Sequence, residues 1–188
     1  MIAVLDVPPA LAHYLDELVA ALREAVELEA VYLVGSAARG AYEEGRSDVD
    51  VVAVTSRPLS KQEKRAVVER VEALECPARG LELVVYAKGA RPPEFEINFN
   101  GGPRMERHVS FDPAAEPWHW FVIDAAIAEE HAVPLVGPPW RELFEPVPSD
   151  RARAAVQAGL AWAEENEPDD ANAARARHYL ETGEWRTK

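Results

Sequence analysis

The stretch VYLVGSAARGAYEEGRSDVDVVAV, from Val31 to Val54, decides the fold of this chain. It begins with a short apolar β-run that ends in a Gly-Ser pair, continues through a turn-rich segment, and enters a second β-run at Asp48. Side chains alternate between the two faces of a strand, so the spacing predicts that Asp48 and Asp50 share one face. Two carboxylates this close repel each other unless a positive charge lies between them. Mg²⁺ meets that need, because carboxylate oxygens are ligands that it prefers.

The Gly-Ser pair, Gly35 and Ser36, predicts a corner that binds a nucleotide. Gly35 lets the backbone turn sharply and approach a ligand without a side chain in between. A helix that begins near Ser36 would direct free N–H groups and its positive dipole end at an anion such as a triphosphate. Ser36 is equally compatible with an ordinary helix N-cap, and Asp-x-Asp at a strand start with solvated surface. The Gly-Ser pair followed, after a short linker, by Asp-x-Asp favours a nucleotide site over these two alternatives.

A third carboxylate, Glu82, stands in the β-rich run LELVVYA at residues 81–87. Leu81 and Leu83 flank it, which makes this a costly place for an unpaired charge. A metal ion or a substrate proton nearby would account for it. The alternative is a polar position in a half-buried strand, which the alternation of the run also permits.

Helix and strand patterns alternate through the first part of the chain. Amphipathic spacing predicts helices over residues 10–28 and 61–74, and β-runs are expected at 31–34, 49–54, 81–87 and 95–100. This order predicts an α/β (α+β) fold, with helices covering a small mixed sheet. Gly101-Gly102-Pro103 is expected to break the pattern.

The later residues predict an α-helical second part. Helices are expected over residues 117–130, 150–165 and 169–181, and a Pro-rich connection over 134–148 holds a short helix near 140–144. We therefore expect a first domain at residues 1–112 and an α-helical second domain at 113–188.

Composition limits the partners that this chain can bind. Its 188 residues carry 20 basic and 33 acidic side chains, a net charge of −13. Such a field repels polyanions, so we expect no nucleic-acid partner; it suits a cationic small molecule, although general surface acidity also explains it. No apolar run approaches the roughly 18 residues of a membrane span, and no signal peptide is recognisable, so we expect no membrane contact and a cytoplasmic location. The single cysteine, Cys76, excludes an internal disulfide, and the five histidines show no metal-ligand spacing.

The segment GSAARGAYEEGRSDVD at residues 35–50 resembles the signature of the DNA-polymerase-β-type nucleotidyltransferases, which is Gly-Ser, a short spacer and Asp-x-Asp. Members of that superfamily need a third carboxylate on a later strand, where this chain has Glu82. HAVPLVGPPWRELFEPVP at residues 131–148 and RARHYLETGEWRTK at 175–188 are similar to segments of the aminoglycoside adenylyltransferases that modify streptomycin and spectinomycin. The resemblance implies the nucleotidyltransferase fold and places the chain closest to that branch.

The resemblance also implies a reaction in which AMP moves from ATP to a hydroxyl of a small, cationic substrate such as an aminoglycoside, and pyrophosphate leaves. ATP would be the co-substrate and Mg²⁺ the cofactor. Asp48, Asp50 and Glu82 would be the catalytic and metal-binding residues, with Glu82 as the general base. The β- and γ-phosphates would lie at Gly35-Ser36.

Residues of the second part are implied as further contacts. Arg175 and Lys188 occupy positions that contact the nucleotide in the family, although solvated helix charges are equally expected there. Asp169 or Asp170 would bind the cationic substrate.

The chain departs from the drug-modifying enzymes at three places. Between the Pro-Asp-Asp stretch and Thr182-Gly183 it is about one helical turn shorter than they are. It has Gly101-Gly102 where they carry a Trp, and it stops at Lys188 where they continue. Two alternatives remain open: a nucleotidyltransferase that modifies a protein, like the minimal antitoxin members, and a non-catalytic nucleotide-binding relative.

Overall fold

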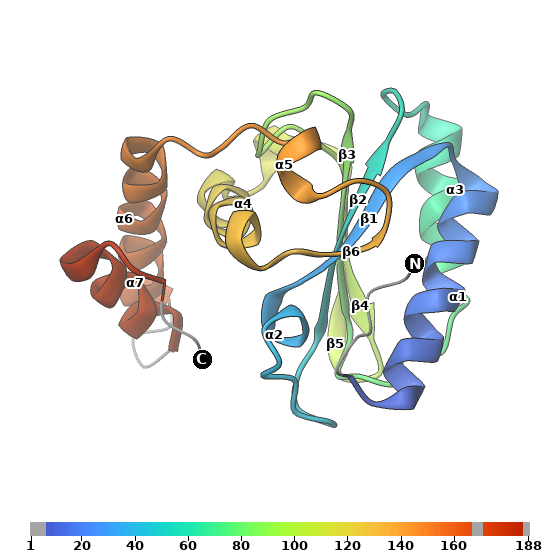
Figure 1. Ribbon diagram of the computed structural model, residues 1–188, viewed down its shortest axis with the longest axis horizontal. Helices are drawn as coiled ribbons and strands as arrows, with labels where there is room; N and C mark the ends of the chain where they lie inside the picture. Colours follow the sequence, from blue (N-terminus) through green and yellow to red (C-terminus); the bar gives the residue numbers. More distant parts are fainter. Residues whose placement is uncertain (1–6, 167–170, 186–188) are drawn as a thin grey trace.

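A six-stranded sheet with the order β5-β4-β3-β2-β1-β6 forms the centre of the molecule (Figure 1). The computed structural model describes residues 7–166 and 171–185. The strands are β1 (Leu28–Val34), β2 (Val49–Thr55), β3 (Leu81–Ala87), β4 (Phe95–Gly102), β5 (Met105–Ser110) and β6 (Val133–Val136). β2 and β3 are parallel and the other neighbours are antiparallel, so the sheet is mixed, as expected.

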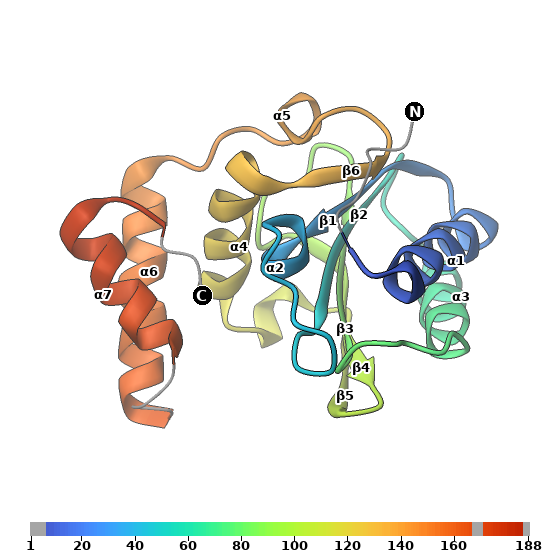
Figure 2. The ribbon, with the colours of Figure 1, turned by 60° about the horizontal axis from the view of Figure 1, so that its bottom comes forward.

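Helices cover both faces of this sheet. They are α1 (Pro9–Ala25), α2 (Gly35–Ala38), α3 (Lys61–Glu72), α4 (Trp118–His131), α5 (Trp140–Leu143), α6 (Ser149–Asn166) and α7 (Ala171–Thr182). Figure 2 shows α1 and α3 on one face and α2 and α4 on the other, with α6 and α7 packed outside α4. The expected α/β fold, with flanking helices and a helical C-terminal region, is confirmed.

The alternation of β2 determines which face carries the acidic residue of that strand. Val49, Val51 and Ala53 lie in the core beneath α1 and α3. Val52 and Val54 belong to the opposite core, which α4 and α5 complete. Because side chains two residues apart project from the same face, Asp50 faces the α4 side.

Two strands of the sheet, β5 and β6, were not predicted from the sequence. We expected Gly101-Gly102-Pro103 to break the pattern, but β4 continues to Gly102 and β5 returns beside it. β5 forms an exposed edge, so its sequence MERHVS lacks apolar alternation. β6 contains Pro134, which a strand tolerates at a sheet edge because no neighbour needs its N–H.

The residues on both sides of the expected boundary at 112–113 share one core. β6 pairs with β1, and the side chains of Trp140 and Phe144 pack against Tyr32 and Tyr86 of the sheet. The described chain becomes purely helical only from α6. The division into two folding units stays a prediction.

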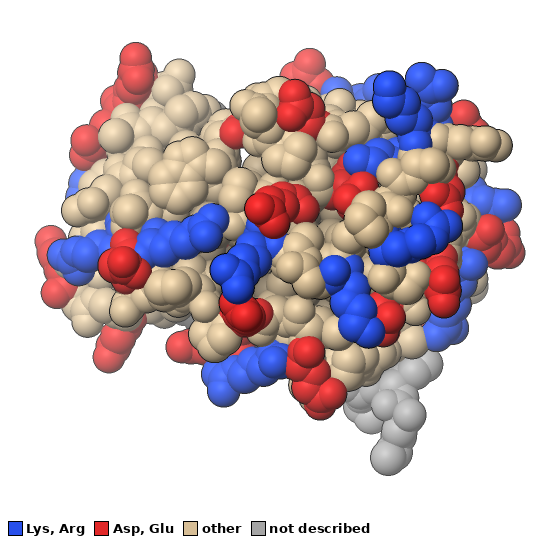
Figure 3. Space-filling model, turned by 90° about the horizontal axis from the view of Figure 1, so that it is seen from above, with Lys and Arg blue, Asp and Glu red and all other residues tan. Residues whose placement is uncertain are grey.

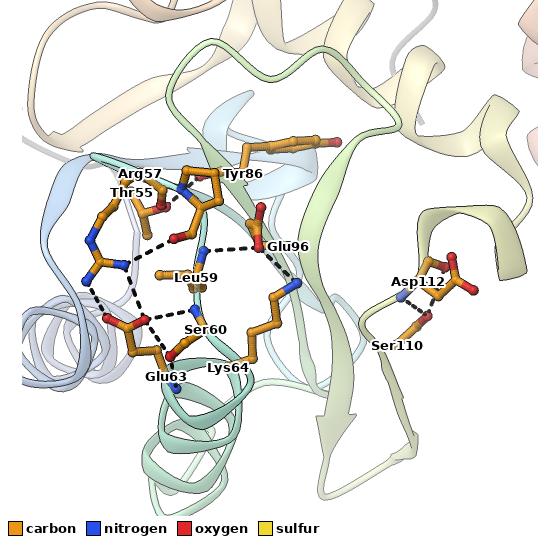
Figure 4. A network of polar contacts seen from close by, with 11 residues as sticks. Thr55, Arg57, Leu59, Ser60, Glu63, Lys64, Tyr86, Glu96, Ser110 and Asp112 are labelled. Carbon is orange, nitrogen blue, oxygen red and sulfur yellow. Dashed lines mark hydrogen bonds and ion pairs between the residues drawn. The ribbon is translucent and has the colours of Figure 1, made fainter.

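The start of α3 is fixed by a network that reaches β4 (Figure 4). Ser60 Oγ accepts from the backbone N–H of Glu63 at 3.3 Å, and Glu63 Oε2 accepts from the Ser60 N–H at 2.8 Å, which is a capping box. Arg57 donates to Glu63 Oε1 at 2.7 Å, and Lys64 lies 2.8 Å from Glu96 of β4. Hydrogen bonds from Arg57 and then Ser60 lower the pKa of Glu63 to about 2.

We expect Ser60→Ala to lower the free energy of unfolding by about 1 kcal/mol, measured by urea denaturation, because the cap is lost. The pKa of Glu63, measured by NMR titration, should rise from about 2 towards its ordinary 4.5. A lowered pKa stabilises the fold above pH 4.5, and this stabilisation disappears as the pH falls towards 2. Ser60→Thr keeps a hydroxyl that can accept from the Glu63 N–H and donate to Glu63 Oε2, so it serves as the control; an unchanged pKa of Glu63 in Ser60→Ala would contradict the assignment.

Candidate functional site

A cavity of about 700 Å³ opens on the α4 side of the sheet. Its walls come from the ends of β1 to β5, from α4, and from the α6–α7 pair. This is a size and a position between elements that ligand sites commonly have. The residues expected at the site that line it are Gly35, Ser36, Asp48, Asp50, Glu82 and Arg175. Three other expected residues, Asp169, Asp170 and Lys188, lie outside the described residues.

Asp50 and Glu82 stand side by side on parallel strands. They are direct partners in the register of β2 and β3, where neighbouring strands are about 4.8 Å apart. Both side chains therefore project from the same face, into the cavity. Pairing that brings two carboxylates together raises their mutual repulsion, so it favours a bound cation.

The backbone of Gly35 lies against the carboxylate of Asp50. Gly35 directly follows Val34, the β1 partner of Asp50, and it has a φ of +64°. A Cβ atom built at Gly35 would lie 1.8 Å from Asp50 Oδ2. Only glycine can adopt this backbone conformation and also fit into the space beside Asp50.

The hydroxyl of Ser36 is buried beside this contact without a hydrogen-bond partner among the described residues. The residue is 5% exposed and lines the cavity. An unsatisfied buried polar group costs about 1–3 kcal/mol, which an oxygen of a bound ligand would offset. The N-cap alternative is wrong, since Val34 caps α2 without a side-chain hydrogen bond and Ser36 lies within its single turn.

Asp48 lies in the loop directly before β2 and contacts a cation of the chain itself. Its Oδ2 is 3.6 Å from Arg79 Nη1, and its side chain is 14% exposed. Arg79 donates its N–H to the Ser47 carbonyl at 3.0 Å, and Val49 donates to Gly80 at 2.9 Å, which joins the two loops.

The donor chemistry of the site fits Mg²⁺, although the acids are not arranged as a complete ligand set. Asp48, Asp50 and Glu82 all offer carboxylate oxygens to one cavity. Within residues 7–166 and 171–185, no three His, Cys, Asp or Glu side chains converge as a metal-binding group. In this arrangement Asp48 forms an ion pair with Arg79.

Several polar residues that line the cavity were not expected from the sequence. They are Arg39, Arg79, Asn98, Asn100, His108, Glu116 and Asp124. The spacing of Asn98 and Asn100 in FEINFN was a readable signal, because two polar residues at an interval of two share one strand face. Glu116 lies in a loop, and no local pattern placed it here.

We expect Gly35→Ala to destabilise the protein more than Gly40→Ala does. Both glycines have a positive φ, of +64° and +68°, so both substitutions carry conformational strain of about 1–2 kcal/mol. A Cβ at Gly40 meets nothing within 4 Å, whereas one at Gly35 displaces Asp50. Urea denaturation of the two variants measures the difference, and equal losses would refute the contact between Gly35 and Asp50.

Comparison with known proteins agrees with this geometry. Residues 15–100 match the family described as Nucleotidyltransferase domain. The chain is 30% identical over 175 residues to an aminoglycoside (3'') (9) adenylyltransferase of Klebsiella pneumoniae, covering 83% of this chain and 63% of that protein. The Escherichia coli protein of the same name matches with the same identity and coverage. The chain thus spans less than two thirds of the length of these relatives.

The fold has a relative of known structure. Spectinomycin adenyltransferase AAD(9) from Enterococcus faecialis, solved with ATP and spectinomycin, superposes with a TM-score of 0.72 at 19% identity, over 93% of this chain and 78% of that one. At this identity the likeness concerns the fold. The match of residues 15–100 to the Nucleotidyltransferase domain family includes the Gly35 corner, Asp48, Asp50 and Glu82, and the fold agrees with that match.

Proposed function

We propose that this protein is a Mg²⁺-dependent adenylyltransferase that moves AMP from ATP to a hydroxyl of a small, cationic substrate and releases pyrophosphate. The observation that carries the proposal is the pairing of Asp50 with Glu82 beside the Gly35 corner. The names of the curated relatives, aminoglycoside (3'') (9) adenylyltransferases, support the choice of an aminoglycoside-like acceptor.

The phosphates of ATP are assigned to the Gly35-Ser36 corner. Gly35 brings a backbone without a side chain to the cavity, and the Ser36 hydroxyl is a buried donor without a partner among the described residues. Arg39 lines the same corner, where its Nε donates to the Gly35 carbonyl at 3.2 Å. A guanidinium at this point favours an anionic group.

The acidic residues are assigned to the reacting centre. Asp48, Asp50 and Glu82 would hold Mg²⁺, which when bound neutralises phosphate charge. Glu82 accepts the proton of the substrate hydroxyl as general base. The hydroxyl oxygen then forms a bond to the α-phosphorus while the bond from that phosphorus to the pyrophosphate oxygen breaks.

The helical part supplies the remaining contacts in this proposal. Arg175 of α7 lines the cavity and is assigned to the nucleotide. Lys188 is proposed for the nucleotide as well, and Asp169 or Asp170 for the cationic substrate. A nucleic-acid substrate is not proposed, because the net charge is −13 and basic and acidic side chains are mixed over the face in Figure 3.

The proposed location is cytoplasmic, where ATP is abundant. Among the described helices, none has the length and apolar character that crossing a membrane requires.

Asp50→Asn should reduce pyrophosphate release from ATP by at least about 100-fold, because an amide is a poorer ligand for Mg²⁺ than a carboxylate. The assay contains ATP, Mg²⁺ and a panel of streptomycin, spectinomycin and other hydroxylated amines. Glu69→Gln removes one exposed charge on α3, across the sheet, and should leave the rate unchanged. Full activity of Asp50→Asn would contradict metal-assisted transfer at this site.

Glu82→Gln should lower kcat by about 10²- to 10⁴-fold, the usual contribution of a general base, while the Kd of ATP changes little. Measuring both kcat and the Kd of ATP separates an effect on the chemical step from an effect on nucleotide binding. Unaltered turnover would remove Glu82 from the role of base.

A further inference from the structure

A row of polar side chains crosses four strands at the level of the acidic pair. Asp50 pairs with Glu82, Glu82 with Asn100, and Asn100 with His108. Directly opposed residues of neighbouring strands project from the same face of a sheet. All four line the cavity, so the polar floor continues from the proposed reacting centre to the edge strand β5.

A carboxylate from outside the sheet lies over the far end of this row. Glu116 follows the short turn Pro113–Ala115, directly before Pro117 and α4. Its Oε1 is 2.8 Å from His108 Nε2, and its Oε2 accepts from Asn98 Nδ2 at 3.4 Å. The side chain is 12% exposed and lines the cavity.

The two contacts position the Glu116 carboxylate and use only some of its hydrogen-bond acceptor positions. A carboxylate offers about four lone-pair positions, and the contacts to His108 and Asn98 use one on each oxygen. The remaining positions can accept hydrogen bonds from a donor in the cavity. A cationic donor would bind most strongly, because a hydrogen bond from an ammonium or guanidinium group to a carboxylate is stronger than one between neutral groups.

Charge is distributed unevenly along the cavity. Among the described residues, five carboxylates and three guanidinium groups line it, and these are Asp48, Asp50, Glu82, Glu116 and Asp124 and Arg39, Arg79 and Arg175. Arg39 contacts the Gly35 carbonyl at the end of β1, and Arg79 contacts Asp48 at the start of β2. Glu116 contacts Asn98 of β4 and His108 of β5. In the strand order, β4 and β5 lie on one side of the Asp50–Glu82 pair and β1 lies on the other side.

We propose that Glu116 binds an ammonium or guanidinium group of the acceptor substrate, and that His108 and Asn98 position its carboxylate. The inference rests on the proposed function and adds where the acceptor lies. In-line transfer puts the attacking hydroxyl and the leaving pyrophosphate on opposite sides of the α-phosphorus. With the phosphates at Gly35-Ser36, the hydroxyl approaches from the β4–β5 side, where Glu116 holds the cation.

Calorimetric titration of streptomycin and spectinomycin into the wild type and Glu116→Gln tests this proposal. The titrations are run with and without Mg²⁺ and α,β-methylene-ATP, an analogue that cannot transfer AMP. We expect Glu116→Gln to weaken acceptor binding by about tenfold or more, as for a lost hydrogen bond between charged groups. The Kd of the analogue and the melting temperature should remain as in the wild type. Glu69→Gln is the matched control with the same loss of one charge, and it should bind like the wild type.

Turnover on an acceptor that binds gives a second readout. Glu116→Gln should raise its KM by a similar factor with little change in kcat, and Glu116→Asp should recover part of the loss. Unchanged acceptor affinity in Glu116→Gln would overturn the proposal, as would equal losses of acceptor affinity, nucleotide affinity and melting temperature, which indicate a structural role. Failure of the wild type to bind any cationic acceptor would also overturn it.

The two proposals fail in distinguishable ways. Acceptor binding that depends on Glu116, without pyrophosphate release by the wild type, would support the subsite and refute the adenylyltransferase. Pyrophosphate release with the same KM for the acceptor in the wild type and in Glu116→Gln would support the adenylyltransferase and refute the subsite.

Discussion

The parallel pairing of β2 with β3 is the constraint on which the rest of the site depends. It sets Asp50 and Glu82 at the same height on one face of the sheet. A slip of one residue in either strand would turn one carboxylate into the apolar core beneath α1 and α3. The apolar residues of β2 and β3, which fill the cores on both faces, therefore fix the register and with it the acidic pair.

Several features of the cavity oppose stability and favour a ligand. Two carboxylates are neighbours, and the Ser36 hydroxyl is buried without a partner among the described residues. Such groups cost free energy in the isolated fold and become favourable when a cation and a phosphate enter. Glu116 also lines the cavity, and its carboxylate contacts His108 and Asn98.

The sequence predicted the parts of the fold and the site that depend on local pattern. Short β-runs predicted β1, β2, β3 and β4, and the order and spacing of Gly35, Asp48 and Asp50 indicated that these three residues lie together. The edge strands β5 and β6 were missed, because an exposed edge needs neither apolar alternation nor freedom from proline. Glu116 was missed as well, since only the tertiary contact of the loop before α4 with β4 and β5 brings it to the cavity. The roles of the site residues stay predictions.

A crystal structure with Mn²⁺ and α,β-methylene-ATP would show whether the acidic residues bind a metal beside the triphosphate, because the anomalous signal of Mn²⁺ locates the metal independently of the rest of the density. We expect manganese to be bound by carboxylate oxygens of Asp48, Asp50 and Glu82, and the terminal phosphates to lie at Ser36. We also expect Asp48 to exchange its contact with Arg79 for the metal. Manganese bound elsewhere, or a triphosphate that avoids the Gly35-Ser36 corner, would contradict the account.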